Sequence, residues 1–249
     1  MMIFMKKILI CFMALALLAI MSMSFNDSSS TVSETGTING HEWVDLGLPS
    51  GLKWAICNVG ALKPEDYGSY FAWGETSPKD EYKLENYKFR ETGDSDDNLA
   101  FNKYNAISNG WTVYLFSNEE VIGRSFVDDK NKLDLSDDAA RQNWGGSWRI
   151  PTNTEMNELR EECNWEWTTL EGKQGYKVTG MNGKSIFLPA AGYRSGTDFI
   201  DDSSCGYYWS SSLSEYGSDL ARGVYFDSEF VNRNDSERYY GFLVRPVTE

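Results

Sequence analysis

The sequence predicts an α+β domain in which short, twisted antiparallel sheets combine with two main helices and long irregular loops. Runs of aromatic and β-branched residues recur at short intervals between clusters of Gly, Asn and Asp, a pattern typical of many short strands. Helical signals are confined to 153–163 and to 137–143, the latter with Ser136 or Asp137 as its cap. Few helices among many strands favour the α+β class.

Nine segments are expected to form strands. They are residues 43–48, 53–59, 69–73, 111–116, 175–179, 185–188, 207–211, 221–226 and 242–247. The strands at 175–179 and 185–188 flank Asn182-Gly183, a pair that favours the positive φ angles of a tight hairpin turn. We therefore expect these two strands to pair with each other.

The clearer helix is expected at 153–163. Thr152 and Glu155 have the spacing of a capping box, in which each side chain satisfies a backbone N–H of the other residue. Met156 and Leu159 follow at helical spacing and predict one apolar face.

The N-terminus has the pattern of a signal peptide over residues 1–24. Lys6 and Lys7 precede an apolar run at 8–20, and small residues follow up to Ser24. The apolar run is shorter than the ~20 residues that a spanning helix needs, although a retained membrane anchor stays open as an alternative. We therefore expect an exported protein that is periplasmic, secreted or displayed at the cell surface, with no membrane insertion after cleavage.

Two further segments follow the signal peptide. Residues 25–39 are rich in Ser, Thr and Gly and are expected to form a flexible tether. Residues 40–249 contain no Pro/Gly/Ser-rich break and are expected to fold as one domain. The net charge of −14 disfavours nucleic acid and anionic membranes as partners, and leaves glycans, proteins and cations.

Enzymatic chemistry receives little support. His41 is the one histidine in the sequence and lies beside the tether, where we expect an exposed position rather than a buried cleft. The sequence contains no G-x-S-x-G and no C-x-x-C, and one His with scattered Cys residues does not supply a closed zinc site. A carboxylate pair in acid/base chemistry stays open among 37 acidic residues. We expect no enzyme activity and no catalytic residue.

A weak calcium pattern occurs at Asp94, Asp96 and Asn98. These oxygen ligands alternate as in the first half of a calcium loop, but Leu99 stands where the loop needs Gly and Asn105 where it needs Glu. We therefore expect no cofactor, with calcium remaining possible.

The segment at 203–240 has the composition of a recognition surface. Tyr and Trp supply large, rigid contact faces, and Ser, Asn and Asp supply adaptable hydrogen bonds. Trp209 and Phe226 are assigned to the core, whereas 232–240 is expected to form exposed loops. The expected contact residues for a glycan or protein ligand are Tyr216, Tyr225, Asn232, Asn234, Asp235, Arg238 and Tyr239.

Several stretches together resemble the Fibrobacter succinogenes major paralogous domain, a family abundant in exported proteins of gut Bacteroidetes. They are HEWVDLGLPSGLKWAICNVGA at 41–61, YFAWGE at 70–75, DDAARQNWGGSWRIPT at 137–152, KSIFLPAAGYR at 184–194, YYWSSS at 207–212 and GFLVRPV at 241–247. The resemblance covers the whole of 40–249 in order. It implies a C-type lectin-like fold related to that of formylglycine-generating enzymes, with the last strand returning beside the first.

The cysteines add a further expectation. Of the four cysteines, Cys11 lies in the predicted signal peptide, so three remain after cleavage: Cys57, Cys163 and Cys205. An odd number in an oxidising compartment indicates one disulfide and one free thiol, with three buried free thiols as the alternative. The resemblance implies that Cys57 pairs with Cys163 and that Cys205 stays free. It also implies that the redox-active cysteine pair of the enzyme branch is missing, and the Glu-Pro-Asn and Trp-Asn-Asp signatures of calcium-dependent lectins do not occur.

Taken together, these observations predict an exported, non-enzymatic binding module that recognises a glycan or protein through its C-terminal loops. Two alternatives remain open: an oxidase or hydrolase on the formylglycine-generating-enzyme-like fold, and a structural subunit of a surface assembly. The oligomeric state is left open.

Overall fold

The chain is represented by a computed structural model that describes residues 34–90, 101–105, 114–117, 120–124, 128–201 and 203–249. The helical elements are α2 (Ala139–Trp144), α3 (Asn153–Glu162) and the short 3₁₀ turns η1 (Leu84–Asn86) and η2 (Leu135–Asp137). The strands are β1 (Thr35–Ile38), β2 (His41–Asp45), β3 (Lys53–Ala55), β4 (Tyr114–Ser117), β5 (Glu120–Arg124), β6 (Asn164–Leu170), β7 (Lys173–Thr179), β8 (Ser185–Pro189), β9 (Tyr193–Ser195), β10 (Asp198–Ile200), β11 (Gly206–Leu213), β12 (Leu220–Phe226), β13 (Val231–Glu237) and β14 (Val247–Thr248).

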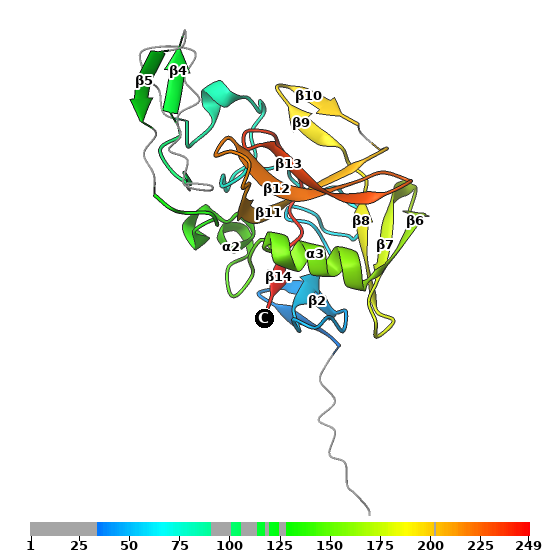
Figure 1. Cartoon of the computed structure of the whole chain (residues 1–249). Helices are drawn as coiled ribbons and strands as arrows, with labels where there is room; N and C mark the ends of the chain where they lie inside the picture. The colour runs from blue at the N-terminus through cyan, green and yellow to red at the C-terminus, as the bar shows by residue number, and fades with distance from the viewer. Residues whose placement is uncertain (1–33, 91–100, 106–113, 118–119, 125–127, 202) are drawn as a thin grey trace, which may run out of the picture. The chain divides into compact units, whose positions relative to one another are not determined.

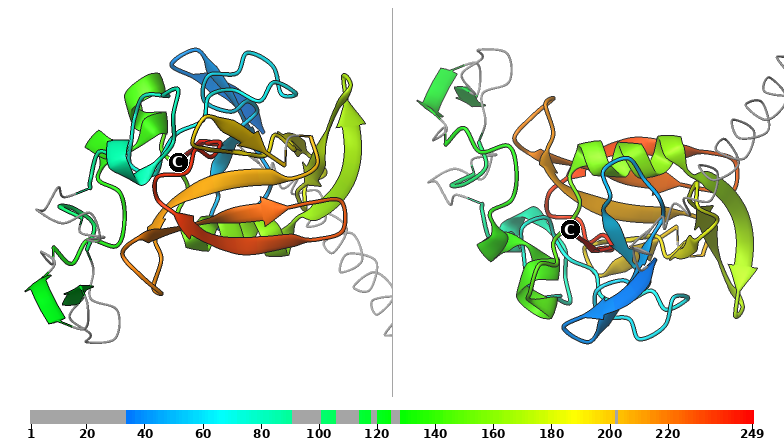
Figure 2. Two further views of the ribbon diagram at one scale, coloured as in Figure 1. Left: turned by 90° about the horizontal axis from the view of Figure 1, so that it is seen from above. Right: turned by 90° about the horizontal axis from the view of Figure 1, so that it is seen from below.

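The described strands form small antiparallel sheets, as the α+β prediction requires. The sheets have the orders β1-β2-β3-β14, β6-β7-β8, β11-β12-β13, β9-β10 and β4-β5. Helix α3 packs alongside the β11-β12-β13 sheet through contacts with β11 and β12 (Figures 1 and 2). The described part of the chain is therefore α+β, with short sheets rather than one large one.

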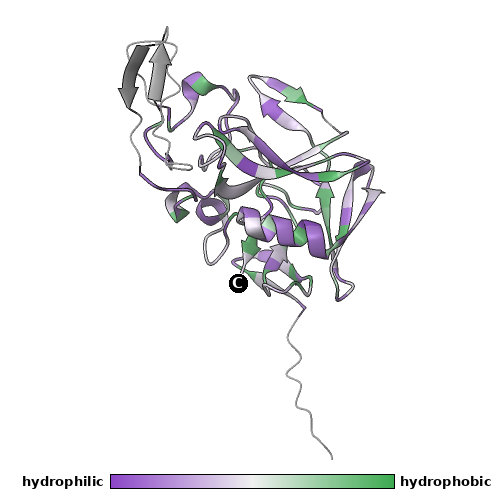
Figure 3. Cartoon of the chain, viewed as in Figure 1, coloured by the Kyte–Doolittle hydropathy of each residue, from purple (hydrophilic) through white to green (hydrophobic). Residues whose placement is uncertain are grey.

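Helix α3 forms where the sequence predicts it. Thr152 Oγ1 accepts a hydrogen bond from the Glu155 N–H at 3.3 Å, and Glu155 Oε2 accepts one from the Thr152 N–H at 2.7 Å, so the capping box is confirmed. Met156 and Leu159 are buried beneath the helix, whose outer face is hydrophilic (Figure 3). Arg149 also donates to both oxygens of Glu155, at 2.7 and 2.8 Å.

The helix expected at 137–143 begins later, at Ala139. Its cap is Asp138, whose Oδ1 accepts from the Arg141 N–H at 2.9 Å. Asp137 does not cap the helix because its carboxylate accepts instead from Lys88, Lys103 and the Tyr104 hydroxyl.

The predicted hairpin is confirmed as β7 and β8. Thr179 pairs with Ser185, and the intervening turn is closed by a hydrogen bond from the Gly183 N–H to the Gly180 carbonyl at 3.0 Å. Gly183 has a φ of 81°, which is the left-handed conformation that the Asn-Gly pair anticipates.

Several predicted boundaries differ from the structure. The strands expected at 43–48, 53–59 and 242–247 are found as β2 (His41–Asp45), β3 (Lys53–Ala55) and β14 (Val247–Thr248). The tether expected at 25–39 ends earlier, because Thr35–Ile38 forms β1 and pairs with β2. Gly36 allows this pairing, since a Cβ at this position would lie 2.5 Å from the Trp43 ring. The loop expected at 232–240 contains β13, which pairs with β12 over seven residues despite its polar sequence. Residues 69–73 form only a single bridge, between Phe71 and Phe242.

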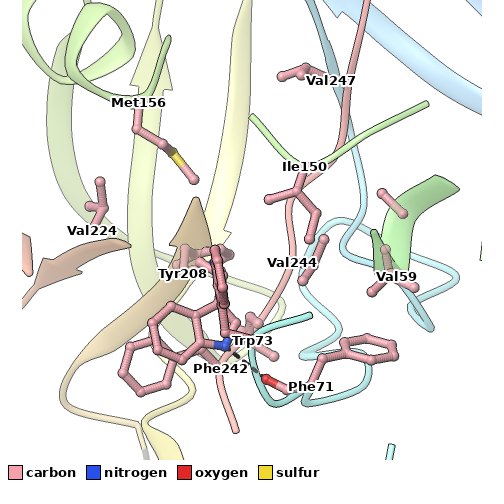
Figure 4. Close-up of a cluster of buried hydrophobic side chains, with 14 of the residues drawn as sticks. Val59, Phe71, Trp73, Ile150, Met156, Tyr208, Val224, Phe242, Val244 and Val247 are labelled. Atoms are coloured by element: carbon pink, nitrogen blue, oxygen red, sulfur yellow. Dashed lines mark hydrogen bonds between the residues drawn. The ribbon is translucent and has the colours of Figure 1, made fainter. Parts of the chain in front are cut away.

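Large aromatic side chains from the helices, strands and loops pack together with aliphatic side chains in the core (Figure 4). Trp209 and Phe226 are buried, as predicted, and so is Trp148. Two buried indole N–H groups donate to backbone carbonyls: Trp73 to Ser210 at 2.8 Å and Trp209 to Phe71 at 2.8 Å. These hydrogen bonds fix the orientation of each ring as well as its burial.

The closing segment at 241–247 is held by Arg245. This side chain is fully buried and donates to Asn58 Oδ1 at 2.9 Å and to the carbonyls of Ala55, Ile56 and Phe187 at 3.1, 3.1 and 2.8 Å. The last strand, β14, pairs with β3. It therefore belongs to the same sheet as β1, but β2 and β3 lie between β1 and β14. None of the helices in the part of the chain that the structure describes has the length and apolar character needed to span a membrane.

Glu155 provides a test of this arrangement through pH. Burial opposes its ionisation, but the hydrogen bonds from Arg149 and Thr152 hold its pKa below the usual value. Its ionised form therefore contributes stability above the unfolded-state pKa of about 4.3, and this contribution is lost as the pH falls through the lowered folded-state pKa. We expect Glu155→Gln to lower the free energy of unfolding by about 1–2 kcal/mol at neutral pH.

Urea denaturation at several pH values measures this effect, and the difference between wild type and Glu155→Gln should shrink on acidification. Glu161→Gln is the matched control, because Glu161 is exposed on the same helix and its loss should cost less than about 1 kcal/mol. A difference that stays constant down to low pH would contradict the prediction.

Candidate functional site

Half-buried aromatic side chains form a continuous row on one surface of the described domain. In spatial order they are Tyr239, Tyr240, Tyr193, Tyr207, Tyr225 and Phe230, and we call these six residues the aromatic row. Successive ring centroids are 4.9, 5.3, 4.8, 5.0 and 6.0 Å apart. The row therefore brings together side chains from β9, β11, β12 and the segments that flank β13.

The strand registers explain how the row is assembled. Tyr207 lies opposite Tyr225 in the antiparallel pair of β11 and β12, so both side chains project from the same face. Their neighbours Tyr208 and Phe226 project from the other face into the core. A bridge between Arg194 and Gly241 brings β9, and with it Tyr193, beside the chain that follows β13.

Phe242 anchors the row to the core. Its buried ring lies 5.8 Å from the Tyr193 ring and 5.1 Å from the Tyr207 ring, and it stacks on Trp209 at 4.0 Å. Aromatic pairs at these spacings add stability beyond the area that they bury. The centre of the row is therefore rigidly supported.

Carboxylates fix two of the tyrosine hydroxyls. The Tyr225 hydroxyl donates to Asp227 Oδ2 at 2.7 Å, and the Tyr207 hydroxyl donates to Asp201 Oδ2 at 3.2 Å. Burial, together with these carboxylates, raises the pKa of both tyrosines well above the ordinary value. Both side chains are consequently protonated at neutral pH and held in one orientation.

Asn232 and Asn234 extend this surface. They lie opposite Tyr225 and Gly223 in the register of β12 and β13, so their side chains share the face of Tyr225. Asn232 is exposed, and Asn234 donates to Ser236 Oγ at 2.8 Å. The surface thus combines aromatic faces with amide and carboxylate groups.

The structure brings together four of the seven predicted contact residues, namely Tyr225, Tyr239, Asn232 and Asn234. Asp235 lies on the opposite face of β13, where its Oδ1 is 3.5 Å from Arg222 Nε. Tyr216 is 69% exposed, but it lies in the turn between β11 and β12, at the end of that hairpin far from Tyr207.

The prediction for Arg238 is wrong, because its side chain is fully buried. It donates to the Tyr87 hydroxyl at 3.0 Å and to the carbonyls of Ser218 and Lys103 at 2.8 and 3.0 Å. Five aromatic rings surround the guanidinium, with centroids 4.5 to 5.8 Å from Cζ. Arg238 is a structural residue that joins the end of β13 to the segments before β4.

The aromatic row contains residues that the prediction did not select. Tyr207 and Tyr240 belong to the aromatic-rich segment at 203–240, but composition does not tell which tyrosines face outward. Tyr193 is distant in sequence, and only the bridge between β9 and Gly241 places it in the row. Phe230 is 46% exposed in the turn between β12 and β13. One signal was available in the sequence: successive side chains of a strand point to opposite faces, so Tyr207 and Tyr208 cannot both face the core.

The cysteines do not form the expected bond: Cys57, Cys163 and Cys205 are free thiols in the structure. Cys57 lines a cavity of about 250 Å³ together with His41 and Trp144, whereas Cys163 caps the end of α3 and packs against the core. The Cys205 thiol lies 3.6 Å from the Tyr225 hydroxyl, at the edge of the aromatic row.

The remaining candidates lie apart from the row. His41 is half-buried rather than exposed, because its ring stacks on Trp144 with centroids 3.8 Å apart. Asp94, Asp96 and Asn98 lie outside the described residues. Among the residues that the structure does describe, no group of three or more His, Cys, Asp or Glu side chains is arranged to hold a metal ion.

Comparisons with known proteins do not assign a family to this chain. No protein family, no curated protein and no solved structure matches it.

The buried Arg238 makes a quantitative prediction about stability. Replacement by Ala leaves buried carbonyls and the Tyr87 hydroxyl without their donor, and each unsatisfied buried group costs about 1–3 kcal/mol. We expect Arg238→Ala to lower the free energy of unfolding by about 3 kcal/mol or more, measured by urea denaturation. Arg233→Ala, an exposed position on the preceding strand β13, should change it by less than about 0.5 kcal/mol. Equal effects of the two substitutions would rule out this role.

The free thiols make a chemical prediction. Burial raises the pKa of Cys57, and raises that of Cys163 to about 11, so few thiolates are present at neutral pH. We expect both thiols in the folded protein to react with iodoacetamide at least tenfold more slowly than in urea, as followed by peptide mass mapping. A disulfide-linked peptide containing Cys57 and Cys163 in the non-reduced digest would show the structure to be wrong here.

Proposed function

We propose that this chain is an exported, non-enzymatic binding module that recognises a glycan through the aromatic row. The observation that carries the proposal is the row itself: six aromatic side chains from separate segments remain partly exposed on one continuous surface. Aromatic side chains that stay partly exposed in a contiguous set are typical of interaction sites.

The chemistry of the surface suits carbohydrate. A sugar ring presents C–H groups on its faces, which pack against aromatic rings, and hydroxyl groups at its edge, which need hydrogen-bond partners. Asn232 and Asn234 supply amide donors and acceptors beside the row, and Asp201 and Asp227 supply carboxylate acceptors. Aromatic faces with a few well-placed polar groups are typical of small-ligand sites.

The rigidity of the row supports binding. Tyr207 and Tyr225 are held by their carboxylates and by the packing of Phe242, so little side-chain freedom is lost when a ligand binds. Tyrosines with a raised pKa are also poor nucleophiles and poor bases at neutral pH, which favours recognition over catalysis.

We further propose that the fold is of the C-type lectin-like kind, as the sequence resemblance implies. Two features support this: α3 follows WRIPT directly, and the segment at 241–247 returns to pair with β3 near the N-terminal strands. In this arrangement the aromatic row is formed mainly by the last third of the chain.

A double variant, Tyr207→Ala with Tyr225→Ala, tests the proposal. Removing two central contact residues should weaken glycan binding at least tenfold, because truncation of a tyrosine at the centre of an interface often costs about 1–2 kcal/mol or more. The measurement is isothermal titration against the best ligand of a glycan array. Circular dichroism should confirm that the variant is folded.

Tyr216→Ala is the matched control, because Tyr216 is an exposed tyrosine outside the row and its loss should leave affinity unchanged. If the double variant binds as tightly as wild type, the site is wrong. If wild type binds no glycan on the array, the function is wrong.

A further inference from the structure

Carboxylates lie around the tyrosines of the aromatic row. The Asp201 carboxylate acts on the hydroxyls of Tyr193 and Tyr207, and the Asp227 carboxylate acts on that of Tyr225. The Glu237 carboxylate acts on the hydroxyls of Tyr193 and Tyr239. Each of these carboxylates acts in the direction that raises the pKa of its tyrosine. The surface of the row therefore has a negative potential, in a chain with a net charge of −14.

The basic side chains nearest in sequence are turned away from this surface. Arg194 follows Tyr193, but its guanidinium donates to the carbonyls of Asp80 and Thr197 at 2.9 and 3.1 Å and lies over the Phe199 ring. Arg233 lies between Asn232 and Asn234 on β13, so its side chain projects from the opposite face. Arg238 precedes Tyr239, but its guanidinium is buried among the rings of the core. These three guanidinium groups therefore do not face the row.

The carboxylates retain capacity for a ligand. Asp201 Oδ2 and Asp227 Oδ2 each accept a hydrogen bond from a tyrosine hydroxyl, and Asp227 Oδ1 also accepts from the N–H groups of Glu229 and Phe230 at 2.8 and 3.1 Å. A carboxylate has about four acceptor sites, so each side chain keeps at least one. An ammonium group placed here would meet both a carboxylate and the negative face of a tyrosine ring, and cation–π contacts of this kind are worth about 0.5–2 kcal/mol.

We propose that the ligand of the aromatic row is a glycan with free, protonated amino groups, such as a chain of 2-amino sugars. This inference rests on the proposed function and narrows it to one class of sugar. Neutral chains meet the same aromatic faces without the charge attraction. Chains of uronic acids are repelled by Asp201, Asp227 and Glu237.

Three oligosaccharides of equal length separate the possibilities: a chain of glucosamine units, its fully N-acetylated counterpart, and a chain of uronic acid units. Titration calorimetry at low salt, below the pKa of the amines, should show the amino chain binding at least tenfold more tightly than the acetylated chain, with the uronate weakest. Added salt should weaken binding of the amino chain far more than that of the acetylated chain.

Asp201→Asn combined with Asp227→Asn tests the residues. At position 201 the amide oxygen can accept from the Tyr207 hydroxyl. At position 227 the amide oxygen can accept from the Glu229 and Phe230 N–H groups while the amide nitrogen donates to the Tyr225 hydroxyl, so the row keeps its shape while losing two charges. The ratio of the two affinities, amino chain over acetylated chain, should fall at least fivefold, because the loss of two carboxylate charges weakens binding of the charged chain most. Glu166→Gln, an exposed position on β6, is the control and should leave the preference unchanged.

The outcomes are distinct. Equal binding of the amino and acetylated chains overturns the charge preference and leaves the glycan-binding function standing. An unchanged preference in the double Asn variant also overturns it. Failure of all three chains, and of every glycan on the array, overturns both the preference and the function.

Discussion

The buried guanidinium groups of Arg238 and Arg245 impose the strictest constraint on this fold. Both side chains are fully buried, and the oxygens that accept from them belong to backbone carbonyls, one tyrosine hydroxyl and one asparagine. Burying a charge costs several kcal/mol unless hydrogen bonds replace the lost water. The carbonyls of Ala55, Ile56 and Phe187 must therefore converge on Arg245, which ties the closing segment to β3 and β8.

The aromatic row depends on the same segment. Tyr239, Tyr240 and Phe242 lie between the two arginines, so the constraint that buries Arg238 and Arg245 also fixes where these rings emerge. Phe242 points inward to stack on Trp209, and the two tyrosines remain at the surface. The rings of the candidate site thus pack directly on core side chains of the closing segment. This packing explains the rigidity of the site.

Local signals in the sequence predicted the parts that local physics determines. Helix α3 and the β7–β8 hairpin follow from a capping box and an Asn-Gly turn, whose hydrogen bonds join residues close in sequence. Strand β13 was missed because its sequence is polar and lacks the alternation of apolar and polar residues that predicts a strand. It forms nevertheless, because its backbone pairs with that of β12. Arg238 was misplaced because two of its acceptors, the Tyr87 hydroxyl and the Lys103 carbonyl, lie more than a hundred positions away in sequence. Tyr193 was missed for a similar reason.

The position of β13 has a consequence for how this protein can change over evolutionary time. Its hydrogen bonds to β12 are made by the backbone, which every residue type except proline provides in full. Asn232 and Asn234 lie at the outer edge of the sheet, so substitution there alters the surface beside the aromatic row without creating a cavity in the core. Selection can therefore adjust specificity at these two positions at little cost in stability, while the buried arginines nearby stay fixed.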